Sequence, residues 1–211
     1  MDLGAEGYHG IESRGMNLWD RGQDSDRWTI FRQSNEGHNT LVIDGQPQRV
    51  SGKGRIIKFF DDPESPHSIV DMSEVYAGQA ESVLRGTALV DSVNVLIQDQ
   101  LSGLEPGSRV RWGMITPASV KAVQGSRIEL RQEGKTLVMT LLAPGGSQWM
   151  IVDTEEPRND WDSPNPGTRM VAFEVVAPES GELTFAVLAV PCASGPAQPK
   201  VTLRSLEDWD K

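Results

Sequence analysis

Short β-branched and apolar runs, each ended by Gly, Pro, Asn or Asp, recur along nearly the whole chain and restrict its fold more than any other feature. The runs repeat roughly every 8–12 residues, as strands do in an all-β sandwich, whereas helical periodicity is scarce. The candidate strands are 28–33, 39–43, 54–60, 68–75, 81–89, 93–101, 109–116, 119–124, 127–132, 136–143, 148–154, 169–176, 182–190 and 200–206. We therefore predict an all-β fold, a two-layer antiparallel β-sandwich of about 12–14 strands.

Local patterns support this assignment. Apolar and polar residues alternate in 127–131 and 135–141, which is typical of strands with one buried and one solvated face. The Gln-Glu-Gly-Lys segment at 132–135 predicts a tight hairpin, and Asp-Gly at 44–45 is a second hairpin signal. In residues 3–14, three glycines would each cost a helix ~1 kcal/mol relative to alanine, so we expect a loop or an irregular strand there.

Length and composition limit the remaining choices. The 211 residues are enough for a sizeable core, and we see no convincing linker, because the richest break, 191–199, lies too near the C-terminus to separate domains. We therefore predict a single domain over residues 1–211. The Pro-Asn-Pro-Gly run at 164–167 predicts a rigid loop.

Charge and hydropathy exclude two classes of partner. The formal net charge of −10 makes binding to phosphate backbones unfavourable, so a nucleic-acid role is excluded. Apolar runs such as 185–190 fall far short of the ~20 residues of a membrane helix. The lone cysteine, Cys192, cannot form an internal disulfide and is expected to be a small buried apolar group. The first residues have neither a basic nor an apolar signal region, so an export signal is not expected within this chain.

The three histidines differ in their surroundings. His38 stands at the mouth of a predicted strand beside Gly37, where an imidazole can face a cleft or simply hydrogen-bond a loop carbonyl. His67 lies in a Pro-rich turn and is expected to be a solvated loop residue, and His9 follows a tyrosine. Nucleophile-elbow, zinc-protease, P-loop and dinucleotide signatures are all missing from the sequence.

Basic and aromatic residues offer further candidates for ligand binding. The acid-free stretch 49–58 carries four positive charges, including Arg55, and either contacts an anionic ligand or forms a solvated face. Six tryptophans accompany only two tyrosines, and indole faces can bind the C–H faces of sugars. Alternation places Trp112 in the core, whereas Trp161 is expected to be the most exposed.

Several segments together resemble the C-terminal β domain of heparinase II/III-like polysaccharide lyases. The His-Asn-Thr-Leu-Val-Ile-Asp-Gly stretch at 38–45 is the most specific of them. The other segments are 2–8, 18–20, 27–28, 31–32, 70–76, 111–118 and 162–167. The resemblance covers most of the chain and implies a larger enzyme, in which an N-terminal α/α toroid and this β-sandwich enclose the substrate cleft.

The resemblance also implies a function: cleavage of a uronic-acid-containing acidic polysaccharide by β-elimination, in the periplasm or outside the cell. That reaction needs neutralisation of the C6 carboxylate, a base for the C5 proton and an acid for the leaving oxygen. Because the family's tyrosine belongs to the toroid, the isolated chain is expected to be inactive. A carbohydrate-binding or purely structural β-sandwich without a catalytic contribution is the alternative.

The resemblance assigns roles to particular residues. His38 matches the histidine of the family's His-Asn-Thr motif and is the catalytic candidate. The candidates for contact with the polysaccharide are Arg32, Asn39, Arg55 and Trp161.

Some family members hold a structural zinc through a motif histidine, an aspartate and a second histidine, with the catalytic histidine two residues earlier. His38 and Asp71 match the first two ligands, but Thr116 stands in the segment where another histidine would be sought, and the earlier position is Glu36. Structural zinc is therefore a hypothesis with an unnamed third ligand, for which His9 or His67 would have to fold back.

Overall fold

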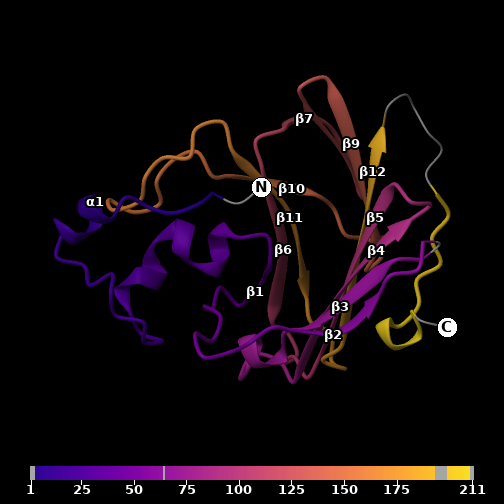
Figure 1. The fold of residues 1–211 in the computed structure, drawn as a ribbon, viewed down its shortest axis with the longest axis horizontal. Helices are drawn as coiled ribbons and strands as arrows, with labels where there is room; N and C mark the ends of the chain where they lie inside the picture. The colour runs from indigo at the N-terminus through magenta and orange to yellow at the C-terminus, as the bar shows by residue number, and fades with distance from the viewer. Residues whose placement is uncertain (1–2, 64, 193–198, 210–211) are drawn as a thin grey trace. The chain divides into compact units, whose positions relative to one another are not determined.

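A computed structural model describes residues 3–63, 65–192 and 199–209, and the chain packs into two compact units. Unit 1 comprises Met1–Val50, Arg109–Ala118 and Met150–Val175, and unit 2 comprises Ser51–Ser108, Ser119–Trp149 and Val176–Lys211. Each unit contains one antiparallel sheet (Figure 1), of four strands in unit 1 and eight in unit 2. Twelve of the expected strands are thus present among the described residues, and the predicted all-β, two-sheet class is confirmed. The prediction of one domain over residues 1–211 stays a prediction.

The sheet of unit 1 has the order β1-β6-β11-β10. Its strands are β1 (Leu41–Ile43), β6 (Arg109–Thr116), β10 (Met150–Asp153) and β11 (Arg169–Val176). Trp112 is buried, as predicted, and its ring stacks on Phe173 with 5.7 Å between ring centroids. A cluster of buried apolar side chains formed by Phe31, Ile115, Met170 and Ala172 joins this sheet to the segment before β1.

Residues 3–40 of unit 1 are helical turns and loops, and here two sequence predictions are wrong. The predicted strand 28–33 is replaced by two 3₁₀ turns, η1 (Asp26–Thr29) and η2 (Phe31–Gln33), because the Ser25 side chain caps η1 by accepting the Arg27 N–H. Within 3–14, where a loop or strand was expected, α1 (Tyr8–Glu12) forms one helical turn. Burial of Ile11 in a cluster with Leu18 and Ile30 offsets the low helix propensity of the glycines.

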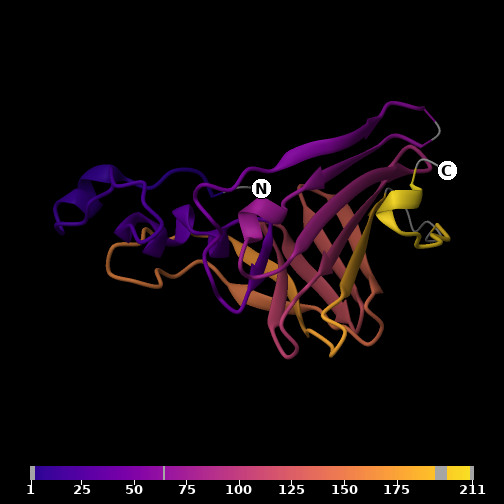
Figure 2. The ribbon, with the colours of Figure 1, turned by 90° about the horizontal axis from the view of Figure 1, so that it is seen from below.

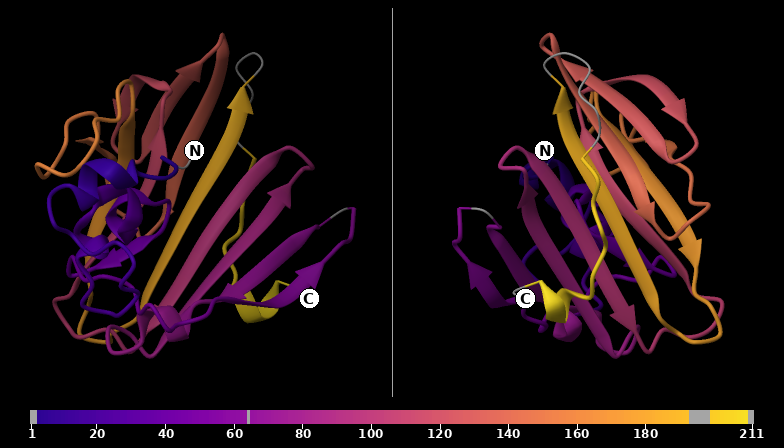
Figure 3. Two further views of the ribbon diagram at one scale, coloured as in Figure 1. Left: turned by 60° about the vertical axis from the view of Figure 1, so that its left-hand side comes forward. Right: turned by 90° about the vertical axis from the view of Figure 1, so that its right-hand side faces the viewer.

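The sheet of unit 2 has the order β2-β3-β4-β5-β12-β9-β8-β7, and Figures 2 and 3 show its strands from further directions. Its strands are β2 (Arg55–Phe60), β3 (His67–Asp71), β4 (Ser82–Val90), β5 (Asn94–Ser102), β7 (Ser119–Gln124), β8 (Arg127–Gln132), β9 (Lys135–Ala143) and β12 (Leu183–Cys192). Cys192, expected to be buried, is half-buried at the end of β12. The edge strand β2 is unusually apolar for its exposure, since Ile56, Ile57, Phe59 and Phe60 are all exposed.

A buried ion pair lies within this sheet. Arg85 of β4 and Asp99 of β5 are direct cross-strand partners, and Arg85 Nε lies 2.6 Å from Asp99 Oδ1. Burial on its own would lower the pKa of Arg85, but the adjacent Asp99 carboxylate overrides it and holds that pKa above its ordinary value. Asp99 is fully buried, so separating it from Arg85 would leave an unpaired buried charge, which is costly. The pair therefore favours the observed register of β4 against β5.

The C-terminal segment follows the sheet of unit 2 without joining it, so the predicted strand 200–206 is wrong (Figure 3). Its backbone bonds to side chains instead of a neighbouring strand: Gln98 Nε2 donates to the Arg204 carbonyl, and Gln100 Oε1 accepts the Leu206 N–H. The short turn η5 (Leu206–Asp208) follows. Gly86 makes room for it, since a Cβ there would lie 2.4 Å from Leu206 Cδ2.

Two more predictions are corrected, one by a local hydrogen bond and one by the pairing of a strand. The strand predicted over 68–75 ends at Asp71, whose Oδ1 accepts the Ser73 N–H and starts the turn η4 (Ser73–Tyr76). The turn at Asp44 and Gly45 exists, with φ of 49° and 68°, but it closes no hairpin because β1 pairs with β6.

The hairpin predicted at 132–135 is confirmed. Glu133 and Gly134 have φ of 49° and 76°, the left-handed pair that a two-residue turn between β8 and β9 requires. Among the described residues, no helix is long and apolar enough to cross a membrane.

Candidate functional site

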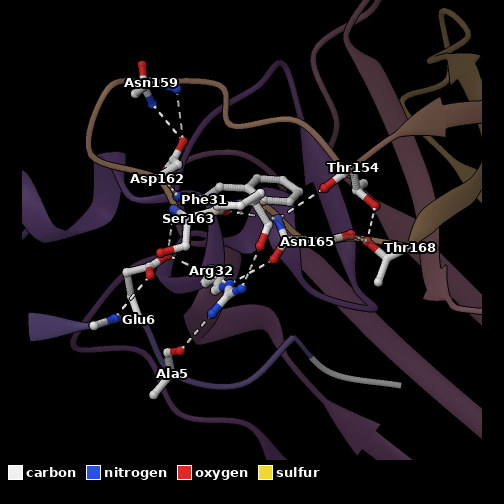
Figure 4. Close-up of polar contacts among 12 residues, drawn as sticks. Ala5, Glu6, Phe31, Arg32, Thr154, Asn159, Asp162, Ser163, Asn165 and Thr168 are labelled. Atoms are coloured by element: carbon white, nitrogen blue, oxygen red, sulfur yellow. Dashed lines mark hydrogen bonds and ion pairs between the residues drawn. The ribbon is translucent and has the colours of Figure 1, made fainter. Parts of the chain in front are cut away.

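Buried polar contacts position the turns that lead to His38. Asp162 Oδ1 accepts the backbone N–H of Phe31 at 2.9 Å, and its Oδ2 accepts the N–H of Asn159 at 3.1 Å (Figure 4). Asn165 Nδ2 donates to the Thr154 carbonyl, within the same loop. Asp162 therefore ties η2 to the loop between β10 and β11, 131 residues along the chain.

Arg32 uses its guanidinium inside this network. Its Nε donates to Asn165 Oδ1 at 2.7 Å, and its terminal nitrogens donate to the carbonyls of Ala5 and Pro164, each at 3.1 Å (Figure 4). The buried Glu6 carboxylate lies 3.7 Å from Arg32 Nε. Arg32 thus holds three chain segments together, while its predicted contact with polysaccharide stays a prediction.

The motif residues His38 and Asn39 connect η3 (Asn35–Gly37) to β1. Asn39 Oδ1 accepts the Ile115 N–H at 2.7 Å, which joins the motif to the end of β6. The backbone N–H of His38 donates to the Asn35 carbonyl. His38 itself is half-buried and has an extended backbone, with φ of −120°. Gly37 is required here, because a Cβ would lie 2.2 Å from the Phe31 carbonyl oxygen.

A cavity of about 600 Å³ opens beside these turns in unit 1. It offers an indole and a phenyl ring, several amides and hydroxyls, two carboxylates and one guanidinium. The lining residues are Gln23, Asp24, Ser25, Trp28, Thr29, Phe31, Ser34, Asn35, Glu36, Gly45, Pro47, Arg158 and Asn159. Trp28 is held in place because its Nε1 donates to the Gly22 carbonyl at 2.7 Å. The mixture of two aromatic rings and many hydrogen-bonding groups suits a polar ligand such as a sugar.

Two arginines meet at Glu36 beside this cavity. Arg158 forms an ion pair with the Glu36 carboxylate and lies over the Phe31 ring, 4.0 Å from its centroid. On the other side, Arg111 Nη2 donates to the Glu36 carbonyl at 3.3 Å. Burial lowers the pKa of Arg111; Glu36 partly opposes this effect and the positive charge of Arg158 adds to it.

The remaining predicted site residues are not among those that line this cavity. Arg55 lies in unit 2, where it pairs with Glu74 at 2.7 Å. Trp161 is half-buried against the Ile11 cluster, so the expectation that it is the most exposed tryptophan is wrong. Trp19 is far more exposed, at 65%. Local sequence could not indicate this, because the apolar neighbours of Trp161 come from distant segments.

The predicted zinc ligands lie in different units, His38 in unit 1 and Asp71 in unit 2. Asp71 Oδ1 accepts both the hydroxyl and the N–H of Ser73, and these bonds lower the pKa of Asp71. Within residues 3–63, 65–192 and 199–209, no three His, Cys, Asp or Glu side chains gather as metal ligands would. The described donors therefore do not fit the hypothesised zinc.

The other two histidines do not support such a site either. His67, predicted to be solvated, is a buried residue of β3 that stacks on Phe60, with Nδ1 2.9 Å from the Ser65 carbonyl. The strand begins one residue earlier than expected, which brings His67 into the sheet. His9 is exposed on α1.

Sequence reasoning missed Trp28 and Arg158, which line the cavity, and Arg111, which donates to the Glu36 carbonyl. Arg158 lies in a loop, where hydrophobic periodicity gives no information about contacts. Arg111 occupies a polar position in the alternating pattern of a strand, like many other strand residues. The only available signal was that both fall near segments of the family resemblance.

Comparison with known proteins identifies the family. The family model described as "Heparinase II/III-like, C-terminal" matches residues 1–191. The chain therefore belongs to the heparinase II/III-like C-terminal family, as its resemblance predicted. A search of curated protein sequences gave no match.

Solved structures share the fold. A mutant of the heparan sulfate lyase HepC from Pedobacter heparinus matches with a TM-score of 0.66 and 14% identity, over 93% of this chain and 28% of that protein. A heparinase III matches with a TM-score of 0.62 and 13% identity, over 90% of this chain and 27% of that protein. The chain thus spans about a quarter of the length of these structures.

Proposed function

We propose that this chain is the β-sandwich part of a polysaccharide lyase that cleaves a uronic-acid-containing acidic polysaccharide by β-elimination, and that it forms one wall of the substrate cleft. The family match and the heparan sulfate lyase among the structural matches support this class of substrate. The observation that carries the proposal is the cavity of about 600 Å³ lined by Trp28, several amides and Arg158. Asn35 and Glu36, shortly before the His-Asn-Thr motif in the chain, also line it, whereas His38 is not among its lining residues.

The groups of this cavity suit one unit of such a polymer. The Trp28 face can pack against the C–H face of a pyranose, and the side chains of Asn35 and Asn159 can bond its hydroxyls. Arg158 supplies a planar donor pair for a carboxylate, whose neutralisation makes the neighbouring C5 proton more acidic. The chain therefore offers groups for binding and charge neutralisation.

His38 is the proposed proton-transfer residue of this wall. Its backbone is anchored on both sides, by its own N–H to Asn35 and by Asn39 to Ile115, so the imidazole has a defined starting position. An imidazole has one nitrogen that can accept a proton and one that can donate it, so it can serve as base or acid. Asn39 and Arg32 act in this scheme by positioning the motif. We propose that the reaction occurs outside the cytoplasm, in a larger enzyme.

The test is a lyase assay that follows the ultraviolet absorbance of the unsaturated uronate product. The 211-residue chain and the longest protein that contains it are compared on heparan sulfate, other glycosaminoglycans and alginate. We expect turnover only with a longer protein that includes a toroid, and a loss of at least ~100-fold for His38→Ala. His9→Ala, at an exposed histidine, is the matched control. Robust turnover by the 211-residue chain, or full activity of His38→Ala, would contradict the proposal.

One observation favours a second candidate, a carbohydrate-binding module without catalysis. The exposed Trp19 and Tyr8 rings form an edge-to-face pair 5.7 Å apart, and Glu12 Oε1 accepts Trp19 Nε1–H at 2.8 Å, which fixes the indole. Such a fixed, exposed aromatic pair can hold a sugar. If Trp19→Ala weakens polysaccharide binding while His38→Ala leaves the activity of the larger enzyme unchanged, this second function is correct.

A further inference from the structure

The charges around Glu36 are unevenly matched. The guanidinium groups of Arg111 and Arg158 lie on two sides of this single residue, and only Arg158 forms an ion pair with its carboxylate. Arg111 Nε is buried and donates no hydrogen bond to any described residue. Glu36 therefore has a positive charge from each of two arginines near it, and Glu174 is a second carboxylate that acts on Arg111.

The Glu36–Arg158 ion pair can be exchanged for another anion. Both side chains are partly exposed, 37% for Glu36 and 30% for Arg158, and such pairs contribute only about 0–1 kcal/mol. Arg158 itself is held by a different contact, because its guanidinium lies on the Phe31 ring, at 4.0 Å from the centroid. Departure of Glu36 would therefore leave Arg158 oriented at the cavity.

Resting on the proposed function, we propose that Arg158 is the residue that recognises the anionic substituent of the polysaccharide, a carboxylate or a sulfate, and that Glu36 is an internal competitor which occupies Arg158 until the ligand displaces it. Arg111 adds positive potential on the far side of Glu36. The other acidic residue that lines the cavity, Asp24, is exposed, so solvent screens its charge. A ligand must therefore carry an anionic group to replace the Glu36 carboxylate on Arg158, and neutral sugars carry none.

The test measures binding by calorimetry with the 211-residue protein. The probes are a heparan sulfate tetrasaccharide, a tetragalacturonate that carries carboxylates but no sulfate, inorganic sulfate, and neutral maltotetraose. We expect Glu36→Gln to tighten binding of the anionic oligosaccharides by up to about fivefold, because the competitor is removed. Arg158→Gln should weaken it about tenfold or more, and Arg158→Lys, which keeps the charge but loses the paired donors, by less.

Controls separate competition from changes in overall charge or in folding. Glu155→Gln removes the same charge from the Glu155–Arg169 ion pair of unit 1, which is not among the residues that line the cavity, and should leave binding unchanged. In the Arg158→Gln background, Glu36→Gln should no longer tighten binding. Thermal unfolding of every variant checks that the fold is retained.

The outcomes also distinguish this inference from the proposed function. Anionic oligosaccharides that bind equally to the wild type, Glu36→Gln and Arg158→Gln would overturn the inference and leave the lyase proposal intact. Arg158-dependent binding of inorganic sulfate without binding of any oligosaccharide would support an anion site and contradict the lyase proposal. The ratio of the affinities for the heparan sulfate tetrasaccharide and for tetragalacturonate shows whether Arg158 binds a sulfate or a carboxylate more tightly.

Discussion

Asn39 and Ile115 are joined by a hydrogen bond of 2.7 Å, from the backbone N–H of Ile115 to the side-chain oxygen of Asn39. The bond sets the position of His38 relative to β6. We expect Asn39→Ala to lower the free energy of unfolding by about 1–2 kcal/mol, because a strand-end N–H loses this acceptor. Asn39→Asp keeps an acceptor and should cost less. Denaturant titration measures both changes, and equal stability of the two variants would contradict the assigned contact.

Gly37→Ala should destabilise the turn before His38. The new Cβ would lie 2.2 Å from the Phe31 carbonyl oxygen, which is backbone and cannot move aside without displacing η2. We expect a loss of about 1–3 kcal/mol, as for other overpacked sites. Gly45 cannot serve as the control position, because its φ is positive and alanine would be strained there. Gly7 is suitable, since it has a negative φ and an added Cβ would meet open space. Gly7→Ala should therefore be nearly neutral, and thermal denaturation of both variants decides the matter.

Glu6 should make the protein more stable at neutral than at acidic pH. Burial on its own would raise the pKa of Glu6, but hydrogen bonds from Ser163 and Gly7 and the charge of Arg32 lower it below 4.5. The folded-state pKa thus lies below the unfolded value, so the stabilisation is present above pH 4.5 and is lost as the pH falls through the folded pKa. Glu6→Gln should destabilise the protein at pH 7 and much less in acid. Glu179→Gln, at an exposed glutamate, should show no such pH dependence.

Breaking the Arg85–Asp99 pair should cost more than replacing it. Arg85→Met leaves the fully buried Asp99 without its cation, and we expect a loss of about 3–5 kcal/mol. The double variant Arg85→Met, Asp99→Leu removes both charges and should recover much of that loss. Urea denaturation of both proteins provides the comparison. A double variant less stable than Arg85→Met would show that the pair is net stabilising.

The strand pattern predicted most of the sheet structure because period-two alternation and turn residues act over a few positions. β6, β7, β8 and β11 have the predicted limits. The failures have causes that the strand pattern does not contain. Residues 28–33 look like a strand, yet a capping serine and the distant Asp162 hold them as 3₁₀ turns. Residues 200–206 alternate like a strand, yet glutamine side chains take their backbone bonds.

The candidate site was only partly predictable. His38 and Asn39 were singled out by a contiguous motif, and the structure shows why the motif needs its asparagine. The Glu36–Arg158 pair spans 122 residues, a separation at which spacing carries no information. The apolar setting of Trp161 also comes from distant residues, so local sequence misjudged its exposure.

The apolar edge strand β2 makes the handling of this protein depend on pH. Ile56, Ile57, Phe59 and Phe60 remain accessible on a strand whose outer edge is unpaired within the described sheet. Such edges promote self-association, which mutual repulsion between highly charged copies opposes. That repulsion vanishes near the isoelectric point of about 4.8. Purification and storage well above that pH, at modest ionic strength, should therefore keep the protein monodisperse, and turbidity should rise as the pH approaches it.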